Sequence, residues 1–589
     1  MQREVRKTVS VVFSDVADST ALAERLDPES LRGVMTRYFE AAREVHERHG
    51  GVVEKFIGDA VMAVFGVPRA AEDDALRAVR AAGELAAAVA SLNRELEAEL
   101  QVALSVRIGV NTGLVVAGDE RQGHAFVGGD TVNLAARLER AAGGGQVLLG
   151  EATYRLVADA VRAEPVAPFV PRGRSGPVAA WRLLEVAPVA AGLARRLDAP
   201  LVGRTAELAA LHAALDRAAA LRACQLVSVV GEAGIGKSRL LRAFATSAGT
   251  RAVVLQASCP PAGAGAAGRV VGQLAAAAGI PGGGGSWPPD PAAADPMAMF
   301  QGLRRLLEGL AATRPVVVTI DDLHRADPLL LDLLEYLQRF TRGTALLLVT
   351  AARGPADRRP CPSAGPAATT LALRPLPPQE AAKLAAGWRR PGPGDATVRR
   401  IAAMAEGNPL VIEELLRELQ GPGPGRLEGL AVPPAVQALI EAELDALPSD
   451  ERQVLELASV VGRVVDWASV AALAPAPLRP RVGSLLLTLT RRNLLRVADP
   501  SLAEEAFSFR TELLRDGAYR SIPKRERLLL HLRAAERLAE GPAAAGGDEA
   551  VGHHLGRAYR YLAQLAGHDL PPPTPAVRPV HDPPVGATA

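Results

Sequence analysis

The segment at residues 231–238, GEAGIGKS, constrains the fold of this chain more than any other. It fits the pattern G-x-x-x-x-G-K-[S/T], follows an apolar run at residues 226–230, and precedes a helical pattern. Glycines in such a loop let backbone N–H groups point at phosphates, while the lysine reaches the β and γ oxygens and the hydroxyl holds Mg²⁺. The sequence therefore predicts an α/β domain in which five loop residues bind Mg-ATP: Gly231, Gly234, Gly236, Lys237 and Ser238.

Two later segments suit the same nucleotide site. Residues 315–327, PVVVTIDDLHRAD, read as an apolar strand that ends in paired acids. Asp321 is expected to bind Mg²⁺, and Asp322 to activate water or sense the nucleotide. Residues 348–353, LVTAAR, read as the next core strand, with Arg353 placed to sense the γ-phosphate.

A helical lid is predicted from EGNPLVIEEL at residues 406–415, which contains Pro409. Together with LVGR at residues 201–204 and the helical region that follows, these motifs resemble the signal-transduction ATPases with numerous domains, called STAND ATPases below. The resemblance is to the branch often fused to cyclases and to LuxR-type regulators. A generic phosphate-loop enzyme is the alternative.

Five polar residues near the N-terminus lie inside three local patterns. The patterns are VSVVFSDVADST (9–20), EKFIGDAVMAVFG (54–66) and GGDTVNLAARLE (128–139), and the residues are Asp15, Lys55, Asp59, Asn133 and Arg137. The first pattern reads as a buried strand, and Gly58-Asp59 joins two apolar runs as a hairpin. A second hairpin is predicted around Asn111-Thr112-Gly113, and a helix from about Asp130. Strands that meet as hairpins predict an α+β domain with a ferredoxin-like sheet. The whole chain is predicted to be multidomain, with this domain as its first part.

Asp15 at a strand end and Asp59 at a hairpin tip are expected to converge as metal ligands. Mg²⁺ and Mn²⁺ prefer carboxylate oxygens together with substrate phosphates. Two carboxylates ~4 Å apart repel by about 4 kcal/mol at an effective dielectric of 20, so two divalent ions are expected in the gap. The alternative is that Asp15 caps the next segment and Asp59 supplies a turn residue.

The three N-terminal patterns resemble the class III adenylate/guanylate cyclases, over roughly residues 7–160. The resemblance implies that Lys55 contacts the purine ring and that Asn133 orients the ribose. It also implies that Arg137, one helical turn from Asn133, stabilises charge on the phosphates. A surface arginine paired with Glu139 or a neighbour is the alternative for Arg137. In this family the carboxylates come from one subunit and the other three groups from its partner, which implies a homodimer with ATP or GTP as substrate.

Phe126 departs from the cyclase pattern. Seven residues before the asparagine, well-studied family members carry a polar residue, Asp or sometimes Thr, that reads the purine. Phenylalanine cannot accept a hydrogen bond from adenine or donate one to guanine, so the polar readout that discriminates bases is lost. The phosphate chemistry does not depend on this position, whereas the choice between ATP and GTP does.

The C-terminal third is predicted to be mostly helical and to resemble the STAND winged-helix segment. FSFRTELLRDGAYRSIP at residues 507–523 carries this resemblance, with Thr511 where the family usually has a nucleotide-holding histidine. A helix at residues 552–567 resembles the start of a helical-repeat sensor. At least ~3 repeats normally share a core, so the sensor is expected to be truncated or lost. The Pro-rich stretch at residues 571–584 cannot build a core.

These patterns predict six successive parts of the 589-residue chain. They are a cyclase domain (1–186), a linker (187–200), the ATPase with its lid (201–425), a winged-helix-like region (426–545), the start of a truncated repeat (546–568) and a disordered tail (569–589).

Bulk composition restricts the partners. A balance of 67 Lys+Arg against 65 Asp+Glu gives a net charge of +2, which makes nucleic-acid or anionic-membrane binding unlikely on electrostatic grounds. Three widely spaced cysteines, no signal-peptide pattern and no apolar run of ~18 residues predict a cytoplasmic protein. A protein or small molecule is expected to supply the activating signal.

Three functions remain open from the sequence. The first is a homodimeric cyclase that forms a cyclic purine nucleotide, cAMP more readily than cGMP, under the control of the ATP-binding switch. The second is a regulator in which the cyclase fold only binds nucleotide or dimerises, which Phe126 favours and the intact Asp15, Asp59, Asn133 and Arg137 oppose. The third, a DNA-binding transcription regulator, rests on the winged-helix resemblance alone.

Overall fold

The protein is described from a computed structural model. The structure describes residues 4–117, 127–170, 176–187, 201–259, 265–280, 295–353, 368–387, 395–419, 432–498, 506–540 and 547–566. They fall into two compact units, the first within Lys7–Ala446 and the second within Leu447–Ala589 together with Met1–Arg6. Most of the predicted linker at 187–200, the boundary at 421–425, the tail at 569–589 and Phe126 lie outside the described residues, and the six domain limits stay predictions.

The first unit begins with an eight-stranded sheet in the order β2-β3-β1-β4-β6-β8-β7, with β5 paired to β4. Its strands are β1 (Val5–Val16), β2 (Val52–Ile57), β3 (Ala60–Phe65), β4 (Val106–Ala117), β5 (Val127–Gly128), β6 (Val147–Gly150), β7 (Val161–Phe169) and β8 (Val178–Val186). Its helices are α1 (Ser19–Arg25), α2 (Pro28–Arg48), α3 (Asp74–Leu100), α4 (Asp130–Ala141) and α5 (Glu151–Val157), followed by a 3-10 turn at Ala158–Ala160.

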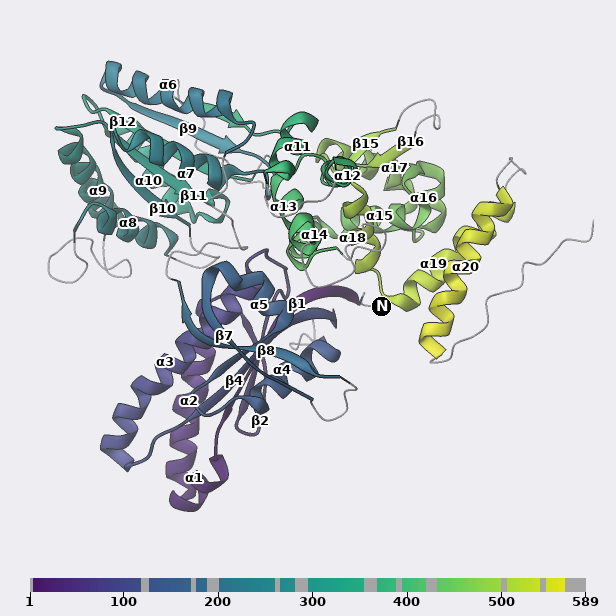
Figure 1. The fold of residues 1–589 in the computed structure, drawn as a ribbon, viewed down its shortest axis with the longest axis horizontal. Helices are drawn as coiled ribbons and strands as arrows, with labels where there is room; N and C mark the ends of the chain where they lie inside the picture. The colour runs from purple at the N-terminus through teal and green to yellow at the C-terminus, as the bar shows by residue number, and fades with distance from the viewer. Residues whose placement is uncertain are drawn as a thin grey trace, which may run out of the picture. The chain divides into compact units, whose positions relative to one another are not determined.

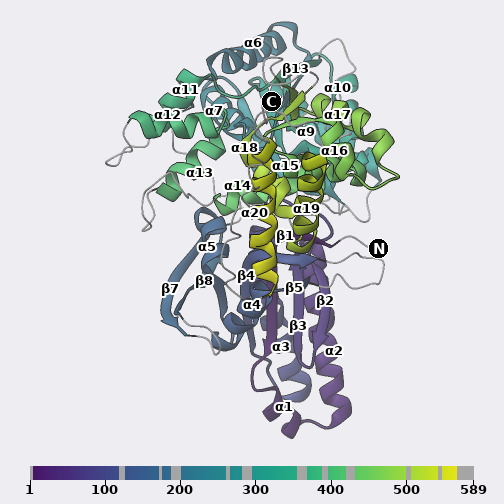
Figure 2. The ribbon, with the colours of Figure 1, turned by 90° about the vertical axis from the view of Figure 1, so that its right-hand side faces the viewer.

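Alternating side chains of the central strands pack into two hydrophobic cores, one on each face of the sheet. On β1, Val9, Val11 and Phe13 pack on the α4 side, whereas Val12 and Val16 face α2 and α3. Successive strand residues point to opposite faces, so a strand that is apolar in nearly every position is buried on both. Figure 2 shows α2 and α3 alongside strands β2 and β3.

The hairpin predicted at residues 111–113 is wrong, because β4 runs unbroken from Val106 to Ala117. A Cβ on Gly113 would lie 2.6 Å from Thr131 Oγ1, and Asn111 Nδ2 donates to the Thr131 carbonyl at 3.1 Å. The Asn-Thr-Gly sequence, typical of a turn, here accommodates the close approach of α4 to the strand. The hairpin at Gly58-Asp59 and the helix from Asp130 are confirmed.

A five-stranded, fully parallel sheet follows in the same unit, in the order β10-β11-β12-β9-β13. Its strands are β9 (Cys224–Val230), β10 (Val253–Ser258), β11 (Val316–Asp321), β12 (Leu346–Ala352) and β13 (Ala368–Ala372). Helices α6 (Thr205–Leu221) and α7 (Lys237–Ala248) share the core on one face. Helices α8 (Ala266–Ala277), α9 (Pro296–Ala311) and α10 (Pro328–Phe340) share the core on the other (Figure 1).

Four further helices complete the first unit: α11 (Pro378–Ala386), α12 (Asp395–Met404), α13 (Pro409–Leu419) and α14 (Pro434–Asp445). Helices α11 to α13 pack on one another, and their assignment as a helical lid stays a prediction. Helix α14 packs against α13 and α5, and its Ala435 and Leu439 belong to the core of the first sheet. The last helix of the unit therefore joins the core of the N-terminal domain.

The second unit is mostly helical, as predicted. It comprises α15 (Ser449–Val461), β14 (Val464–Asp466), α16 (Trp467–Leu473), a 3-10 turn at Arg479–Arg481, α17 (Val482–Arg491), β15 (Leu495–Val497), β16 (Ala506–Phe509), α18 (Glu512–Ser521), α19 (Lys524–Glu540) and α20 (Gly547–Ala566). The strands form a small antiparallel sheet, β14-β16-β15. Thr511 caps α18, accepting a hydrogen bond from the Leu514 N–H at 3.0 Å. The ferredoxin-like and winged-helix assignments stay predictions.

Candidate functional site

Strand register brings Asp15 and Asp59 together. Strands β1 and β3 are antiparallel, with Ser14 opposite Val61. One residue further along β1 lies Asp15, beside the start of β3 and the hairpin turn that holds Asp59. A hydrogen bond holds Ser14 in place, since its hydroxyl oxygen lies 2.9 Å from that of the fully buried Tyr38. Two carboxylates distant in sequence thus meet at one edge of the sheet.

Several charged side chains lie close together at this edge of the sheet. Burial raises the pKa of Asp15, and the neighbouring Asp59 carboxylate raises it further, while Arg107 opposes both. Arg107 Nη2 donates to Asp15 Oδ2 at 2.6 Å, and its Nε lies 3.3 Å from Glu139 Oε1. Burial and the Asp15 charge raise the pKa of Glu139 to about 7. Two carboxylates, those of Asp15 and Glu139, therefore share one arginine, and Asp59 lies beside Asp15.

This carboxylate pair fits a divalent cation. Mg²⁺ is held in many nucleotide sites by one or two carboxylates plus substrate phosphates, so a dedicated cage is not required. The described residues contain no group of three His, Cys, Asp or Glu side chains arranged for a metal. A cation between Asp15 and Asp59 would relieve the repulsion that raises the Asp15 pKa.

The other three predicted residues of the first domain lie on different elements. Lys55 is on β2 with its side chain 44% exposed, 4.0 Å from Glu54. Asn133 and Arg137 lie one turn apart on α4, Asn133 exposed and Arg137 half-buried. Phe126 is outside the described residues. The structure thus brings the two acids together and leaves Lys55 and Asn133 facing solvent.

Arg107 and Glu139 are residues that the sequence motifs did not assign to the site. Glu139 closes the GGDTVNLAARLE pattern and is 5% exposed. Its position two residues after Arg137 suggests a surface helical residue, whereas the structure turns it inward to Arg107 on β4. Only the packing of α4 on β4 reveals this ion pair.

The phosphate-loop motif adopts the backbone that its glycines permit. Gly234 and Gly236 have φ angles of +74° and +100°, in the region that disfavours side chains, and Gly236 precedes the first turn of α7. Lys237 Nζ donates to the Gly231 and Glu232 carbonyls at 2.9 and 2.7 Å. Burial lowers the pKa of Lys237 to about 8. A buried cation beside exposed N–H groups is suited to an anion.

The lid closes over this loop through Asn408, which the motifs did not single out. Its Nδ2 donates to the Ala233 carbonyl at 3.0 Å, and the Leu410 N–H donates to the Gly234 carbonyl at 3.3 Å. Pro409 between them begins α13 and lines the pocket above the loop. The helical lid is therefore attached to the phosphate loop itself.

One of the two predicted acids and the predicted arginine converge on the same pocket. Asp322, Ser238, Pro409 and Arg353 line it, whereas the Asp321 carboxylate accepts a hydrogen bond from the Asp322 N–H at 2.9 Å. The pocket encloses about 750 Å³ when its open mouth is included.

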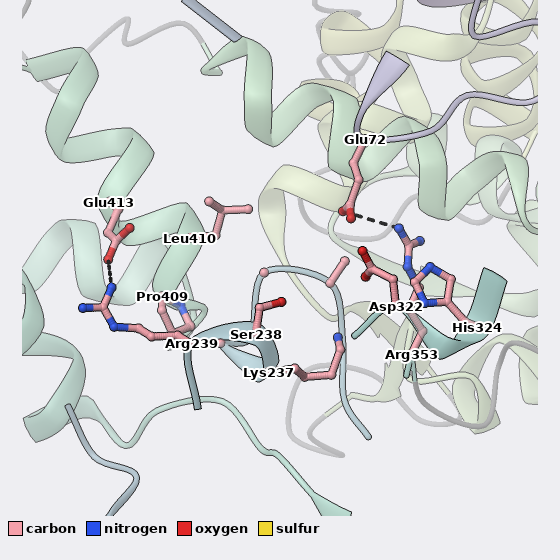
Figure 3. A pocket seen from close by; sticks show the side chains of 13 residues that line it. Glu72, Lys237, Ser238, Arg239, Asp322, His324, Arg353, Pro409, Leu410 and Glu413 are labelled. Carbon is pink, nitrogen blue, oxygen red and sulfur yellow. Dashed lines mark ion pairs between the residues drawn. The ribbon is translucent and has the colours of Figure 1, made fainter. Parts of the chain in front are cut away.

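Glu72 also lines this pocket, although it belongs to the turn that precedes α3 of the first domain. Figure 3 shows its carboxylate directed at Arg353, near Asp322 and His324. Glu72 Oε2 and Arg353 Nη2 lie 3.4 Å apart. Nothing in the local sequence around Glu72 signals a nucleotide site.

Comparison with known proteins identifies both domains. Residues 1–181 match the adenylate and guanylate cyclase catalytic domain, and residues 200–349 match the AAA ATPase domain. An uncharacterized protein of Rhizobium meliloti (strain 1021) is 28% identical over 588 residues, which cover 90% of this chain and 56% of that protein. Adenylate cyclase 1 of the same organism is 30% identical over 176 residues, 29% of this chain and 26% of its own length.

Among solved structures, the adenylyl cyclase CyaB from P. aeruginosa is 29% identical and covers 32% of this chain and 100% of its own, with a TM-score of 0.31. A TM-score of this size is too low to establish a shared fold. The chain spans just over half of the first R. meliloti relative and about a quarter of the second. The order of these two matches, a cyclase catalytic domain followed by an AAA ATPase domain, is the order that the motifs predicted. None of its described helices has the length and apolarity to cross a bilayer.

Proposed function

We propose that the first domain is a nucleotidyl cyclase that forms a 3′,5′-cyclic purine nucleotide from a nucleoside triphosphate with two divalent ions. The observation that carries this proposal is the convergence of Asp15 and Asp59 at the β1 end, where burial and then the Asp59 carboxylate raise the pKa of Asp15. Bound Mg²⁺ or Mn²⁺ supplies a lowered pKa for the ribose 3′-hydroxyl and neutralises phosphate charge. Arg107 keeps Asp15 oriented and ionised beside Asp59.

We propose that the site is completed by a second copy of the chain. Lys55 and Asn133 are exposed, so in one copy they present polar groups to solvent rather than to a substrate. Beside Lys55, the large apolar side chains of Val52, Phe56 and Ile57 are 38–48% exposed on the same strand. Exposed apolar groups that adjoin polar candidates are typical of an interaction surface. In this arrangement Lys55 contacts the purine, Asn133 the ribose, and Arg137 the phosphates.

We propose cAMP rather than cGMP as the product, because several curated relatives are named adenylate cyclases. The second domain is proposed to bind Mg-ATP at Gly231, Gly234, Gly236, Lys237 and Ser238 and to act as a STAND-type switch. Its support is the loop backbone, the lid attached to it through Asn408, and the convergence of Asp322 and Arg353 on one pocket. The element order of the second unit, in which β15 and β16 follow α17 and β16 pairs with the earlier strand β14, suits the winged helix of such switches.

A second function is a catalytically weak cyclase module inside an ATP-dependent regulator. Phe126 favours it, because an apolar side chain at that position cannot read a purine edge. Asp15 and Asp59 remaining together favours the active enzyme.

The two functions are separated by assaying the full chain for cAMP and cGMP formation from ATP and GTP with Mn²⁺ or Mg²⁺. Asp59→Ala and Arg137→Ala are tested alone and mixed. A cyclase with shared sites loses activity in each variant and regains part of it in the mixture, since one of the two sites in a mixed dimer is intact. A folded, dimeric protein that forms no product under any condition supports the regulator.

A further inference from the structure

The turn between β3 and α3, residues 66–73, is held rigidly. Lys7 Nζ donates to the Pro68 carbonyl and to Asp445 Oδ2, each at 2.7 Å, and the same carboxylate accepts from the Ala70 N–H at 2.7 Å. Lys7 and Asp445 are both 5% exposed, so this network is nearly dry. The turn is therefore tied to β1 on one side and to α14 on the other.

Two consecutive acids at the end of this turn reach arginines of the ATPase domain. Asp73 Oδ2 accepts from Arg325 Nη1 at 2.7 Å, and Asp73 Oδ1 accepts from Arg77 Nε at 3.2 Å. Asp73 is almost fully buried, yet its two arginines hold its pKa well below the usual range. Arg325 lies three residues after Asp322, at the end of a 3-10 turn. The contact of Asp73 is short, buried and doubly charged, which makes it a fixed anchor.

Glu72 makes a looser contact inside the nucleotide pocket itself. Its carboxylate lies 3.4 Å from Arg353, against 2.7 Å for the neighbouring Asp73–Arg325 pair. The side chains of Glu72 and Arg353 are 9% and 19% exposed. Burial lowers the pKa of Lys237 and of His324, and the charge of Glu72 partly opposes this in each case. Glu72, Asp322 and Glu413 are the acids that line the pocket, and Glu72 is the one that forms an ion pair with Arg353 (Figure 3).

We propose that Glu72 is a built-in competitor of the γ-phosphate: its carboxylate holds Arg353, so a nucleoside triphosphate must displace Glu72 from the pocket, whereas a diphosphate need not. This inference rests on the proposed assignment of residues 231–238 as a triphosphate site. It makes a residue of the cyclase domain part of the ATP site of the other domain.

The charges around Arg353 explain why a γ-phosphate would displace the Glu72 carboxylate. Without nucleotide, Glu72 forms an ion pair with this guanidinium, and Asp322 lines the same pocket. A γ-phosphate that reaches Arg353 brings further negative charge next to the Glu72 carboxylate, and like charges at such distances in a partly buried site repel. The exchange breaks the ion pair of Arg353 with Glu72 and forms one with the γ-phosphate. The free-energy difference between these two pairings is therefore small enough for a bound triphosphate to reverse it.

The consequence for the first domain comes from chain connectivity. Glu72 follows β3 by seven residues, and β3 begins at the hairpin that holds Asp59. Displacing Glu72 frees this end of the turn from Arg353, while Asp73 keeps it attached to Arg325. Coupling between two sites is reciprocal in free energy, so whatever arrangement of the turn the cyclase favours feeds back on triphosphate affinity.

The test is nucleotide binding by the full chain, measured by isothermal titration calorimetry with Mg²⁺. Every variant carries Asp59→Ala, which removes a metal ligand from the first domain, so that failure of the cyclase proposal leaves this test intact. Glu72→Gln keeps the size of the side chain and removes its charge. The non-hydrolysable triphosphate AMP-PNP is expected to bind about fivefold to twentyfold tighter to Glu72→Gln, whereas ADP affinity changes by less than about twofold.

Three controls make the result specific. In an Arg353→Gln background, Glu72→Gln should no longer change AMP-PNP affinity, because the pair is already broken. Asp159→Asn removes a different, exposed ion pair, 3.6 Å from Arg417 on α13, and should leave both affinities unchanged. Lys237→Ala should abolish binding. Unchanged or weaker AMP-PNP binding by Glu72→Gln, an equal gain for ADP, or binding that persists in Lys237→Ala would overturn the proposal; thermal unfolding verifies that each variant is folded.

Discussion

Gly109 is the position where a single methyl group should separate activity from folding. It lies on β4 under α4, and a Cβ there would sit 2.3 Å from both the Ala135 carbonyl oxygen and the Glu139 amide nitrogen. Ordinary contacts of a Cβ begin at 3.4 Å, and both atoms are backbone, so the helix has to move by roughly 1 Å. Helix α4 carries Asn133 and Arg137, which would move with it.

The expected result of Gly109→Ala is a fall of about 100-fold in kcat, because a misplacement of ~1 Å in groups that orient a reacting substrate costs about that much. Overpacking should lower the free energy of unfolding by about 1–3 kcal/mol. The assay is cyclic nucleotide formation at saturating ATP, together with thermal unfolding of the same sample at a temperature where the variant is folded.

The matched control is Gly33→Ala on α2, where a Cβ would meet nothing within 4 Å. Alanine in an exposed helix stabilises by up to about 1 kcal/mol relative to glycine, so this variant should be fully active and slightly more stable. If Gly109→Ala kept full activity and stability, the close packing of α4 on β4 would not be what positions Asn133 and Arg137.

Two further predictions concern charge. Arg107→Ala leaves the Asp15 and Glu139 carboxylates without their shared cation; because Arg107 is 30% exposed, the loss should be at the low end for a buried pair, about 1–3 kcal/mol. Without Arg107, the pKa of Glu139 in the folded state should rise further above its unfolded value, so stability is lost as pH rises. The loss of thermal stability relative to wild type should therefore be larger at pH 8 than at pH 5. An equal loss at both pH values would contradict the ion-pair assignment. Burial and His554 lower the pKa of His531 to about 3, so its unfolded form binds protons first as pH falls. Between pH 7 and pH 5, protonation of His531 in the unfolded state should lower the free energy of unfolding by up to about 2 kcal/mol. Chemical denaturation should find no such loss in His531→Gln.

The coarse architecture was accessible from sequence because it depends on short-range patterns. The apolar run before GEAGIGKS predicted β9, and the motif predicted the loop and the start of α7 within one residue. Gly58-Asp59 between two apolar runs predicted the β2–β3 hairpin. Each of these signals lies within about a dozen residues, where backbone propensity and hydrogen bonding decide the outcome.

The same local logic failed at Asn111-Thr112-Gly113. Those residues favour a turn when considered alone, but β4 continues through them. The glycine is needed because Thr131 of α4 approaches within van der Waals distance, a requirement that exists only once the helix is packed on the sheet. Tertiary contact outweighed local propensity.

The candidate sites divide in the same way. Sequence alone indicated which side chains carry chemistry, including Asp15, Asp59 and Lys237, because the motifs specify residue types at fixed spacings. The partners of those side chains came only from the tertiary structure: Arg107 beside Asp15, 92 positions away, and Glu72 beside Arg353. Ion pairs of this kind form between residues whose separation along the chain is arbitrary, and only the packing of sheets and helices sets the distance between their charges.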